Sequence, residues 1–302
     1  MDKFLIVIVG PTAIGKTELA IRIAEEFNTD ILSADSRQFY REMSIGTAKP
    51  SPEELSAVKH LFINSHSITE KFNVGDFEQQ AIATLGDLYQ TKNAAVMVGG
   101  SGLYISAVTN GLDDLPKENS LLREQLNQLV KEKGLGPLQD QLKHVDPIYF
   151  QSVDINNPQR IIRALEVSLS SGRPFSSFRH NLKKSRPFEI IKIVLNTDRA
   201  KLYERINLRV DDMISKGLVE EVRSLVSYRH LNALQTVGYS EILDYLEGKT
   251  SLDEAIEKVK QNTRRFAKRQ LTWFRKDSDI NWFEPVDTQS ILSFLKGKLG
   301  YN

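Results

Sequence analysis

The sequence predicts an α/β fold, in which a three-layer parallel sheet carries an inserted helical domain. An apolar run at Phe4–Val9 precedes a helical pattern at Lys16–Phe27 and a second short strand at Asp30–Ala34. The alternation of helix and strand continues to Ala94–Val98, whereas residues 113–186 hold amphipathic segments without a strand-like run. Strands separated by helices pair in parallel and are covered on both faces, so ligands are expected at the carboxyl ends of the strands.

The elements of the core can be predicted in chain order. Phe4–Val9 (FLIVIV) is apolar throughout, which is typical of a strand buried on both faces. Val74–Gln90 has apolar residues at helical spacing, and the strand Ala94–Val98 ends in two glycines before a helix expected at Gly102–Thr109. After the insertion, Phe188–Asn196 is predicted to return to the sheet, and a helix is expected at 199–216.

The inserted helical domain is predicted to span 113–186, between core segments 1–112 and 187–302. Its amphipathic stretches include Leu121–Lys133 and Gln159–Leu169. The chain beyond the returning strand is predicted to be mostly helical.

Composition limits the classes of function. The 302 residues include 40 Lys and Arg against 39 Asp and Glu, so the net charge of +1 gives no overall attraction to nucleic acid or membranes. A nucleic-acid site must therefore be a local patch. The absence of cysteine excludes disulfides and a thiol nucleophile, and it fits a reducing cytoplasm. No segment predicts export or a membrane span, and a monomer is the default expectation.

Residues 10–17 read GPTAIGKT, which matches the phosphate-loop pattern of Gly, four residues, Gly, Lys and Ser or Thr. Glycine allows the backbone to turn so that successive N–H groups surround phosphate oxygens at a helix N-terminus. Lys16 adds a positive charge, and the Thr17 hydroxyl can reach a bound Mg²⁺. A plain glycine turn is the alternative. The predicted phosphate-binding residues are Gly10, Pro11, Thr12, Ala13, Ile14, Gly15, Lys16 and Thr17.

A phosphate loop does not fix the reaction, because kinases, GTPases and other transferases share it. A typical P-loop NTPase also has an apolar strand that ends in an Asp holding Mg²⁺. The strand Ala94–Val98 ends instead in the glycine-rich segment 99–102, whereas Asp30–Ala34 delivers Asp35 to the same edge of the sheet. From the residues alone, Asp35 could cap a turn or hold Mg²⁺ through water.

Seven further motifs follow the phosphate loop: DSRQFY (35–40), GTAKP (46–50), GDF (75–77), GGSGLY (99–104), NPQRIIRALE (157–166), VGY (237–239) and AKRQLTWFR (267–275). In this order and spacing the chain resembles the bacterial tRNA dimethylallyltransferases over nearly its whole length. The pair DSRQFY and GTAKP after a phosphate loop is highly specific. The resemblance implies a P-loop NTPase-like fold.

The resemblance implies transfer of a dimethylallyl group from dimethylallyl diphosphate to N6 of adenosine 37, in tRNAs that read codons beginning with U. The loop would hold the donor's diphosphate rather than a nucleotide to be cleaved. Lys16, the loop amides and Mg²⁺ at Thr17 would then stabilise the negative charge that grows on the leaving diphosphate. Asp35 is implied to be the general base for N6. Ser101 occupies a catalytic position where the family usually has Thr, and it keeps the hydroxyl.

The same resemblance implies contacts with the anticodon stem-loop, from which the target base must be extruded. On a helix Ile161 and Ile162 can also face a core, and a lone Arg123 can be merely solvated. The implied tRNA-contacting residues are Asp35, Ser36, Arg37, Gln38, Ser101, Arg123, Gln159, Arg160, Ile161, Ile162 and Arg163.

A further diphosphate contact is implied at Arg209. Arg205 lies one helical turn earlier on the same face, so the sequence leaves open which of the two arginines contacts the diphosphate.

The helical segment Leu252–Lys276 ends in a basic stretch. At about 100° per residue, its six cationic residues fall within an arc of roughly 140°. The apolar residues expected on the packed side are Phe266, Ala267, Leu271, Trp273 and Phe274. Such a stripe can follow RNA phosphates, although a merely solvated basic face is the alternative. The basic residues are Arg264, Arg265, Lys268, Arg269, Arg275 and Lys276, of which Lys268, Arg269 and Arg275 are the predicted tRNA contacts.

Two other functions remain open from the residues. A small-molecule kinase would use the loop for ATP, and a noncatalytic RNA-binding module would keep only a degenerate loop. The basic stretch and DSRQFY argue against the kinase, and the intact loop argues against the module.

Overall fold

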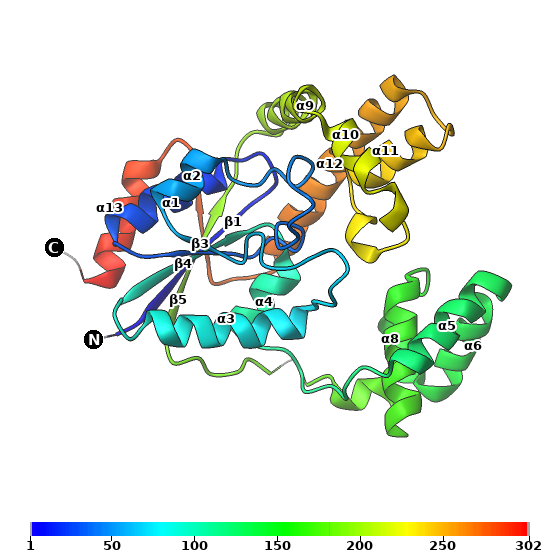
Figure 1. The fold of residues 1–302 in the computed structure, drawn as a ribbon. Helices are drawn as coiled ribbons and strands as arrows, with labels where there is room; N and C mark the ends of the chain where they lie inside the picture. Colours follow the sequence, from blue (N-terminus) through cyan, green and yellow to red (C-terminus); the bar gives the residue numbers. More distant parts are fainter. Residues whose placement is uncertain (1, 181, 301–302) are drawn as a thin grey trace. The chain divides into compact units, whose positions relative to one another are not determined.

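The computed structural model describes residues 2–180 and 182–300, which form two compact units (Figure 1). The core unit comprises Met1–Thr109 and Ser185–Asn302, and the insertion unit comprises Asn110–Lys184. These limits differ from the expected 113–186. Arg186 belongs to the core unit because its guanidinium donates to Glu78 at 2.6 Å and to the Val108 carbonyl at 2.8 Å.

The core unit is built on a six-stranded sheet in which all described strand pairs are parallel, which confirms the α/β prediction. The strand order is β3-β2-β4-β1-β5-β6. The central strand β1 lies between β4 and β5, so the loop that follows β1 emerges in the middle of the sheet edge. The strands are β1 (Phe4–Val9), β2 (Ile31–Ser33), β3 (His60–Leu61), β4 (Ala94–Gly99), β5 (Glu189–Leu195) and β6 (Ile280–Phe283).

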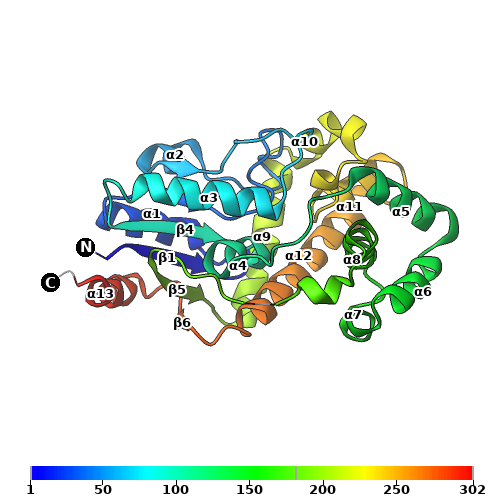
Figure 2. The ribbon, with the colours of Figure 1, turned by 90° about the horizontal axis from the view of Figure 1, so that it is seen from below.

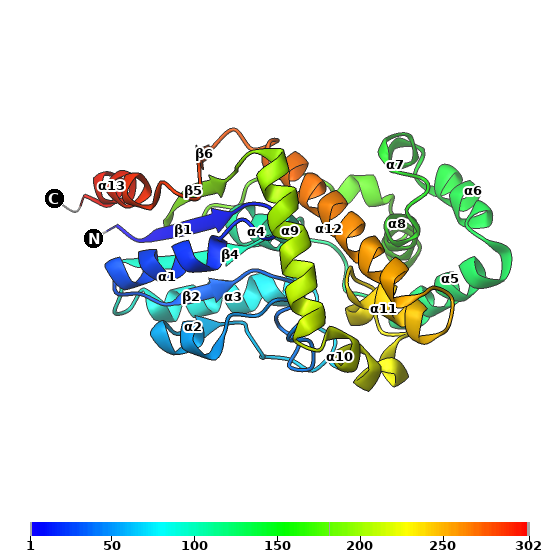
Figure 3. The same cartoon turned by 90° about the horizontal axis from the view of Figure 1, so that it is seen from above.

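Side chains of β1 point alternately to the two faces of the sheet, and helices cover both faces. Ile6 and Ile8 pack on the face that α1 (Lys16–Glu26), α9 (Arg199–Ser215) and α13 (Thr288–Leu299) cover (Figure 3). Leu5 and Val7 pack on the opposite face, under α3 (Val74–Leu88) and α4 (Gly102–Asn110) (Figure 2). The three-layer arrangement is therefore as predicted.

A helical cluster completes the core unit. The short helix α2 (Pro52–Ala57) begins in a capping box at Ser51. Buried side chains of α10 (Leu218–Ser224), α11 (Tyr239–Leu246) and α12 (Leu252–Phe274) pack together with Tyr40 and Met43. Two 3₁₀ turns, Val226–Tyr228 and Asn232–Leu234, connect α10 to α11.

The insertion unit is helical, as predicted, and has a hydrophobic core of its own. Its helices are α5 (Ser120–Lys133), α6 (Gly136–Val145), α7 (Pro147–Ser152) and α8 (Pro158–Ser171), followed by the 3₁₀ turn Phe175–Phe178. Leu126, Leu138 and Leu165 are among its buried residues. None of the helices described in either unit is long and apolar enough to cross a membrane.

Candidate active site

The loop between β1 and α1 has the backbone that its glycines allow. Gly10 has φ +151°, and a Cβ there would lie 2.7 Å from the Leu195 carbonyl oxygen of β5, so no larger residue fits. Gly15 has φ +101° at the N-cap of α1, and Ala13 also has a positive φ of 64°. The loop therefore wraps tightly over the end of β1.

The amides of this loop are available for an anion. The N–H groups of Ala13, Ile14 and Gly15 have no hydrogen-bond partner within residues 2–180 and 182–300. The Thr12 N–H, in contrast, donates to the Gln270 side chain at 2.9 Å. A set of free amides at the N-terminus of α1 binds phosphate oxygens through their aligned dipoles.

Lys16 is half-buried beside the loop, and its Nζ donates to the Pro11 carbonyl at 2.8 Å. Burial, and next the positive charge of Arg209, lower the pKa of Lys16 to about 7, while Asp35 acts in the opposite direction. An ammonium group placed in this way is poorly compensated, so a bound polyanion would supply the charge that it lacks.

The loop forms one side of a cavity of about 310 Å³ at the carboxyl edge of the sheet. Lys16, Thr17, Asp35 and Arg209 all line it, together with Gln38 and the two glycines at the end of β4, Gly99 and Gly100. Residues from six separate stretches of the sequence (12–18, 33–38, 47–63, 98–100, 209 and 266–270) therefore meet at this edge, where parallel α/β sheets bind their ligands.

Asp35 follows β2 and presents a carboxylate to the cavity. Its Oδ1 accepts the backbone N–H of Arg37 at 2.9 Å, whereas Oδ2 has no hydrogen-bond partner among the described residues. The Ser101 hydroxyl fixes the same turn, because it accepts the Ser36 N–H at 3.0 Å and lies 3.2 Å from the Ser36 hydroxyl. Phe39 is buried behind this turn and stacks on Phe77.

The GTAKP segment is held from two sides. Gln38 donates to the carbonyl oxygens of Thr47 and Ala48, both at 3.2 Å, and its own amide oxygen accepts the Ser33 hydroxyl. The Lys49 ammonium donates to the Tyr40 carbonyl at 2.6 Å, and burial lowers its pKa to about 8. Gln38 thus builds the wall of the cavity within the core unit.

Glu221 of α10 anchors the same segment from outside. Its carboxylate accepts the backbone N–H groups of residues 44–46 at 2.8 to 3.0 Å and the Tyr239 hydroxyl at 2.6 Å. A Cβ at Gly46 would lie 2.5 Å from the Tyr239 ring, so the GTAKP and VGY motifs fit against each other.

The helix α12 connects the phosphate loop with the loop after β4. Gln270 is buried; its side-chain oxygen accepts the Thr12 N–H, and its Nε2 donates to the Gly100 carbonyl at 2.9 Å. A Cβ at Gly102 would lie 2.4 Å from the Trp273 indole, so α12 packs directly on this loop.

The basic stretch of α12 is only partly as expected. Lys268, Arg269 and Arg275 are exposed and have no ion pair among the described residues, although Arg275 is the C-cap because the helix ends at Phe274. Arg264 is half-buried and donates to Asn207 at 2.6 Å, so it belongs to the packed side. The expected packed side is confirmed for Ala267 and Phe274, which are buried, and Leu271 is half-buried. Phe266 and Trp273 are 37% and 43% exposed, so they are packed only in part.

The structure separates the two candidate arginines of α9. Arg209 lines the cavity with Lys16, whereas Arg205 does not line it and donates to the Ile14 carbonyl at 3.3 Å. Only Arg209 is placed to face a ligand in the cavity.

A family profile described as IPP transferase matches residues 38–277. A tRNA dimethylallyltransferase of Christiangramia forsetii is 52% identical over 99% of both chains. This chain belongs to the IPP transferase family. Its members named in these comparisons are prenyl-transferring enzymes, and the chain is a transferase of that kind.

Solved IPP transferases share the fold. The full-length tRNA isopentenylpyrophosphate transferase of Bacillus halodurans is 36% identical, with a TM-score of 0.73 over 99% of this chain and 97% of that one. A eukaryotic dimethylallyltransferase acting on tRNA is 26% identical, with a TM-score of 0.81 over 95% of this chain and 75% of that one.

The tRNA-contacting residues expected in the insertion unit fall into three groups. Gln159 and Arg160 are exposed in the first turn of α8. Ile161 and Ile162 are buried in the hydrophobic core of the unit, so the expectation that their side chains touch tRNA is corrected. Arg123 and Arg163 are partly exposed and paired with a buried Glu166.

Sequence reasoning missed the roles of three polar residues: Gln270 and Glu221, which hold segments beside the cavity, and Glu166, which holds the insertion unit together. Their partners lie far away in the sequence, so no local pattern reveals the contacts. A usable signal exists for Glu166 and Gln270, because each polar side chain occurs on the apolar, core-facing side of its helix.

Proposed function

We propose that this chain transfers the dimethylallyl group of dimethylallyl diphosphate to N6 of adenosine 37 in tRNA. One observation carries the proposal. The free amides of the phosphate loop and the unpartnered carboxylate oxygen of Asp35 belong to the same cavity. A site for a leaving diphosphate thus adjoins a proton acceptor, as an alkylation of an amine requires.

The loop, Lys16 and Arg209 bind the diphosphate. As the bond between C1 of the prenyl group and the diphosphate oxygen breaks, negative charge grows on that oxygen. The free N–H groups of Ala13, Ile14 and Gly15 face this charge, so they stabilise the transition state more than the bound donor. The lowered pKa of Lys16 rises again when the anion binds, which restores its ammonium form.

Asp35 accepts the proton that the acceptor loses. The lone pair of N6 forms the new bond to C1, the pair of the C1–O bond leaves with diphosphate, and Oδ2 of Asp35 takes one N6 proton. The Arg37 N–H and the Ser101 hydroxyl hold this turn in place, so the free oxygen keeps its direction.

The Thr17 hydroxyl and the Asp35 carboxylate are hard oxygen donors on one cavity, which fits Mg²⁺ held jointly with a diphosphate. Thr17 would be the protein ligand of the ion. When bound, Mg²⁺ would neutralise part of the diphosphate charge.

The anticodon stem-loop would contact exposed cations and polar residues. In the core unit these are Lys268, Arg269 and Arg275, together with the half-buried Arg37; in the insertion unit they include Gln159 and Arg160. We expect the protein to act as a monomer. We expect the reaction to take place in the cytoplasm.

The decisive experiment incubates the protein with dimethylallyl diphosphate, Mg²⁺ and unmodified tRNA, and then detects prenylated adenosine by mass spectrometry. Formation of this product supports the proposal. Absence of the product, together with turnover of ATP on another acceptor, would overturn it in favour of a kinase.

Asp35→Asn tests the proton acceptor. The substitution keeps the shape and the hydrogen bond from Arg37, but the amide cannot accept the N6 proton. We expect prenyl transfer to fall at least about 10²-fold, with tRNA affinity nearly unchanged. Asp30→Asn is the matched control. Asp30 lies just before β2, at the end of the strand away from Asp35, and it pairs with Lys59. Retained turnover in Asp35→Asn would remove Asp35 from the role.

A further inference from the structure

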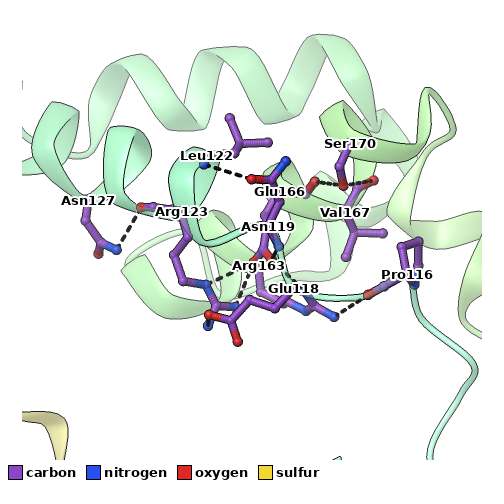
Figure 4. Close-up of polar contacts among 10 residues, drawn as sticks. All are labelled: Pro116, Glu118, Asn119, Leu122, Arg123, Asn127, Arg163, Glu166, Val167 and Ser170. Atoms are coloured by element: carbon purple, nitrogen blue, oxygen red, sulfur yellow. Dashed lines mark hydrogen bonds and ion pairs between the residues drawn. The ribbon is translucent and has the colours of Figure 1, made fainter. Parts of the chain in front are cut away.

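Glu166 is a fully buried carboxylate in the insertion unit, and both of its oxygens carry hydrogen bonds (Figure 4). Oε1 accepts the Asn119 backbone N–H and Arg163 Nη1, each at 2.9 Å. Oε2 accepts Arg123 Nε at 2.9 Å and Nη2 at 2.7 Å. One charge therefore joins the start of α5 to two guanidinium groups, one from α5 and one from α8.

The same two guanidinium groups also hold the segment that leads into α5. Arg163 Nη2 donates to the Pro116 carbonyl at 3.2 Å, and Arg123 Nη1 lies 3.3 Å from the Glu118 carboxylate. Each guanidinium has five N–H groups, so both keep donors that these contacts do not use. The side chains of Arg123 and Arg163 are 32% and 27% exposed, so both remain partly accessible to solvent.

A buried carboxylate with several charge-assisted hydrogen bonds fixes the rotamers of its partners. Arginine loses considerable rotamer freedom when it binds a phosphate, so an arginine that is already oriented binds with a smaller entropy loss. Glu166 thus prepares two guanidinium groups without covering their outward edges.

Glu118 has the opposite character. Its side chain is 37% exposed, and it meets Arg123 on the side away from Glu166. An RNA phosphate that approaches the free edge of Arg123 competes with this carboxylate. Glu118 therefore occupies the place at Arg123 that an RNA phosphate would take. Because this ion pair lies at the surface, it is weak and easily exchanged.

We infer that Glu166 is a positioning residue for tRNA binding, which orients Arg123 and Arg163 toward RNA phosphates, and that Glu118 competes with the RNA for Arg123. The inference rests on the proposed function, because the RNA is the proposed acceptor. It adds one carboxylate that promotes binding and another that opposes it.

The first test measures binding and kinetics of Glu166→Gln with the full-length protein and an unmodified tRNA. We expect the Kd for tRNA to rise about tenfold, because the amide cannot hold two guanidinium groups. At saturating tRNA, kcat and the KM for dimethylallyl diphosphate should stay within about twofold of the wild-type values, because the cavity lies in the core unit. Unchanged tRNA affinity would overturn the inference.

A double-mutant cycle separates positioning from simple structural support. In the background Arg123→Ala with Arg163→Ala, Glu166→Gln should cause little further loss of tRNA affinity if it acts through the arginines. An equal loss in both backgrounds would show that Glu166 only supports the fold and would overturn the inference.

Glu118→Gln provides a test that survives even if Glu166→Gln does not fold. We expect tRNA binding to tighten by about threefold. Glu124→Gln is the matched control, since this exposed α5 residue removes the same charge from the same unit. Equal effects of Glu118→Gln and Glu124→Gln would refute competition at Arg123. Wild-type protein that binds tRNA tightly but forms no prenyl-adenosine would contradict the proposed function alone.

Discussion

Lys16 and Asp35 have opposite tasks in one cavity, and their surroundings differ accordingly. Burial and the nearby positive charge of Arg209 disfavour the ammonium form of Lys16 until an anion binds. Asp35 has one oxygen fixed by a backbone N–H and the other free. Lys16, which needs a bound anion, and Asp35, which can accept a proton, thus lie in one cavity at the carboxyl edge of the sheet.

The lowered pKa of Lys16 predicts proton uptake on donor binding. At pH 8, above the pKa of about 7, Lys16 is mostly neutral in the free protein, and the bound diphosphate raises its pKa so that it takes up a proton. At pH 6 it is already charged, and no uptake is expected. Calorimetric titration with dimethylallyl diphosphate in two buffers of different ionisation enthalpy measures the difference. Lys16→Ala should abolish the uptake at pH 8, and buffer-independent heats for the wild type would refute it.

At the scale of elements, α12 serves two surfaces. Gln270 faces the phosphate loop, whereas Lys268 and Arg269 face solvent. Because these neighbouring residues face different sides of the helix, substitutions on α12 can test donor binding and tRNA binding separately.

Gln270→Ala should loosen the phosphate loop. It removes the acceptor of the Thr12 N–H and the donor to Gly100, and it leaves buried groups unpaired. We expect the KM for dimethylallyl diphosphate to rise about tenfold, with tRNA affinity little changed. Gln261→Ala, at an exposed position of the same helix, is the control. Equal losses of donor and tRNA binding would contradict this assignment.

Replacing Lys268 and Arg269 by Ala tests the exposed side of α12. If both contact phosphates, tRNA binding weakens and the slope of log K against log salt becomes shallower by about 1 to 2. Lys258→Ala removes a cation from the same helix outside the basic stretch and should leave the slope unchanged. An identical slope in wild type and double variant would mean that this face is only solvated.

At the scale of the whole molecule, the sequence predicted what depends on local pattern. The strand β1, the phosphate loop and α1 are determined within some twenty-five residues, by apolar runs and glycine spacing. The strands β3 and β6 were missed, because β3 has two residues and β6 is a half-exposed edge strand. The roles of Gln270 and Glu221 depend on contacts across 258 and 175 residues, which no periodicity records.

Separate hydrophobic cores predict separate responses to a cavity mutation. Leu138 is fully buried in the insertion unit, and Leu138→Ala should cost about 2 to 5 kcal/mol there. Hydrogen exchange should then accelerate in α5–α8 and stay slow in the sheet. Leu121→Ala, at a mostly exposed position, is the control. Equal acceleration in both units would show that they unfold together.

The insertion leaves and rejoins the core at neighbouring points of the backbone. The Lys184 N–H donates to the Asn110 carbonyl at 2.7 Å. Two residues later, the Arg186 guanidinium donates to the carbonyl oxygens of Ala107 and Val108. A short turn between Asn110 and Lys184 would close this gap if the insertion were removed, because every residue that lines the cavity lies outside the insertion. Evolution could therefore exchange or reshape the insertion while the residues that line the cavity stay unchanged.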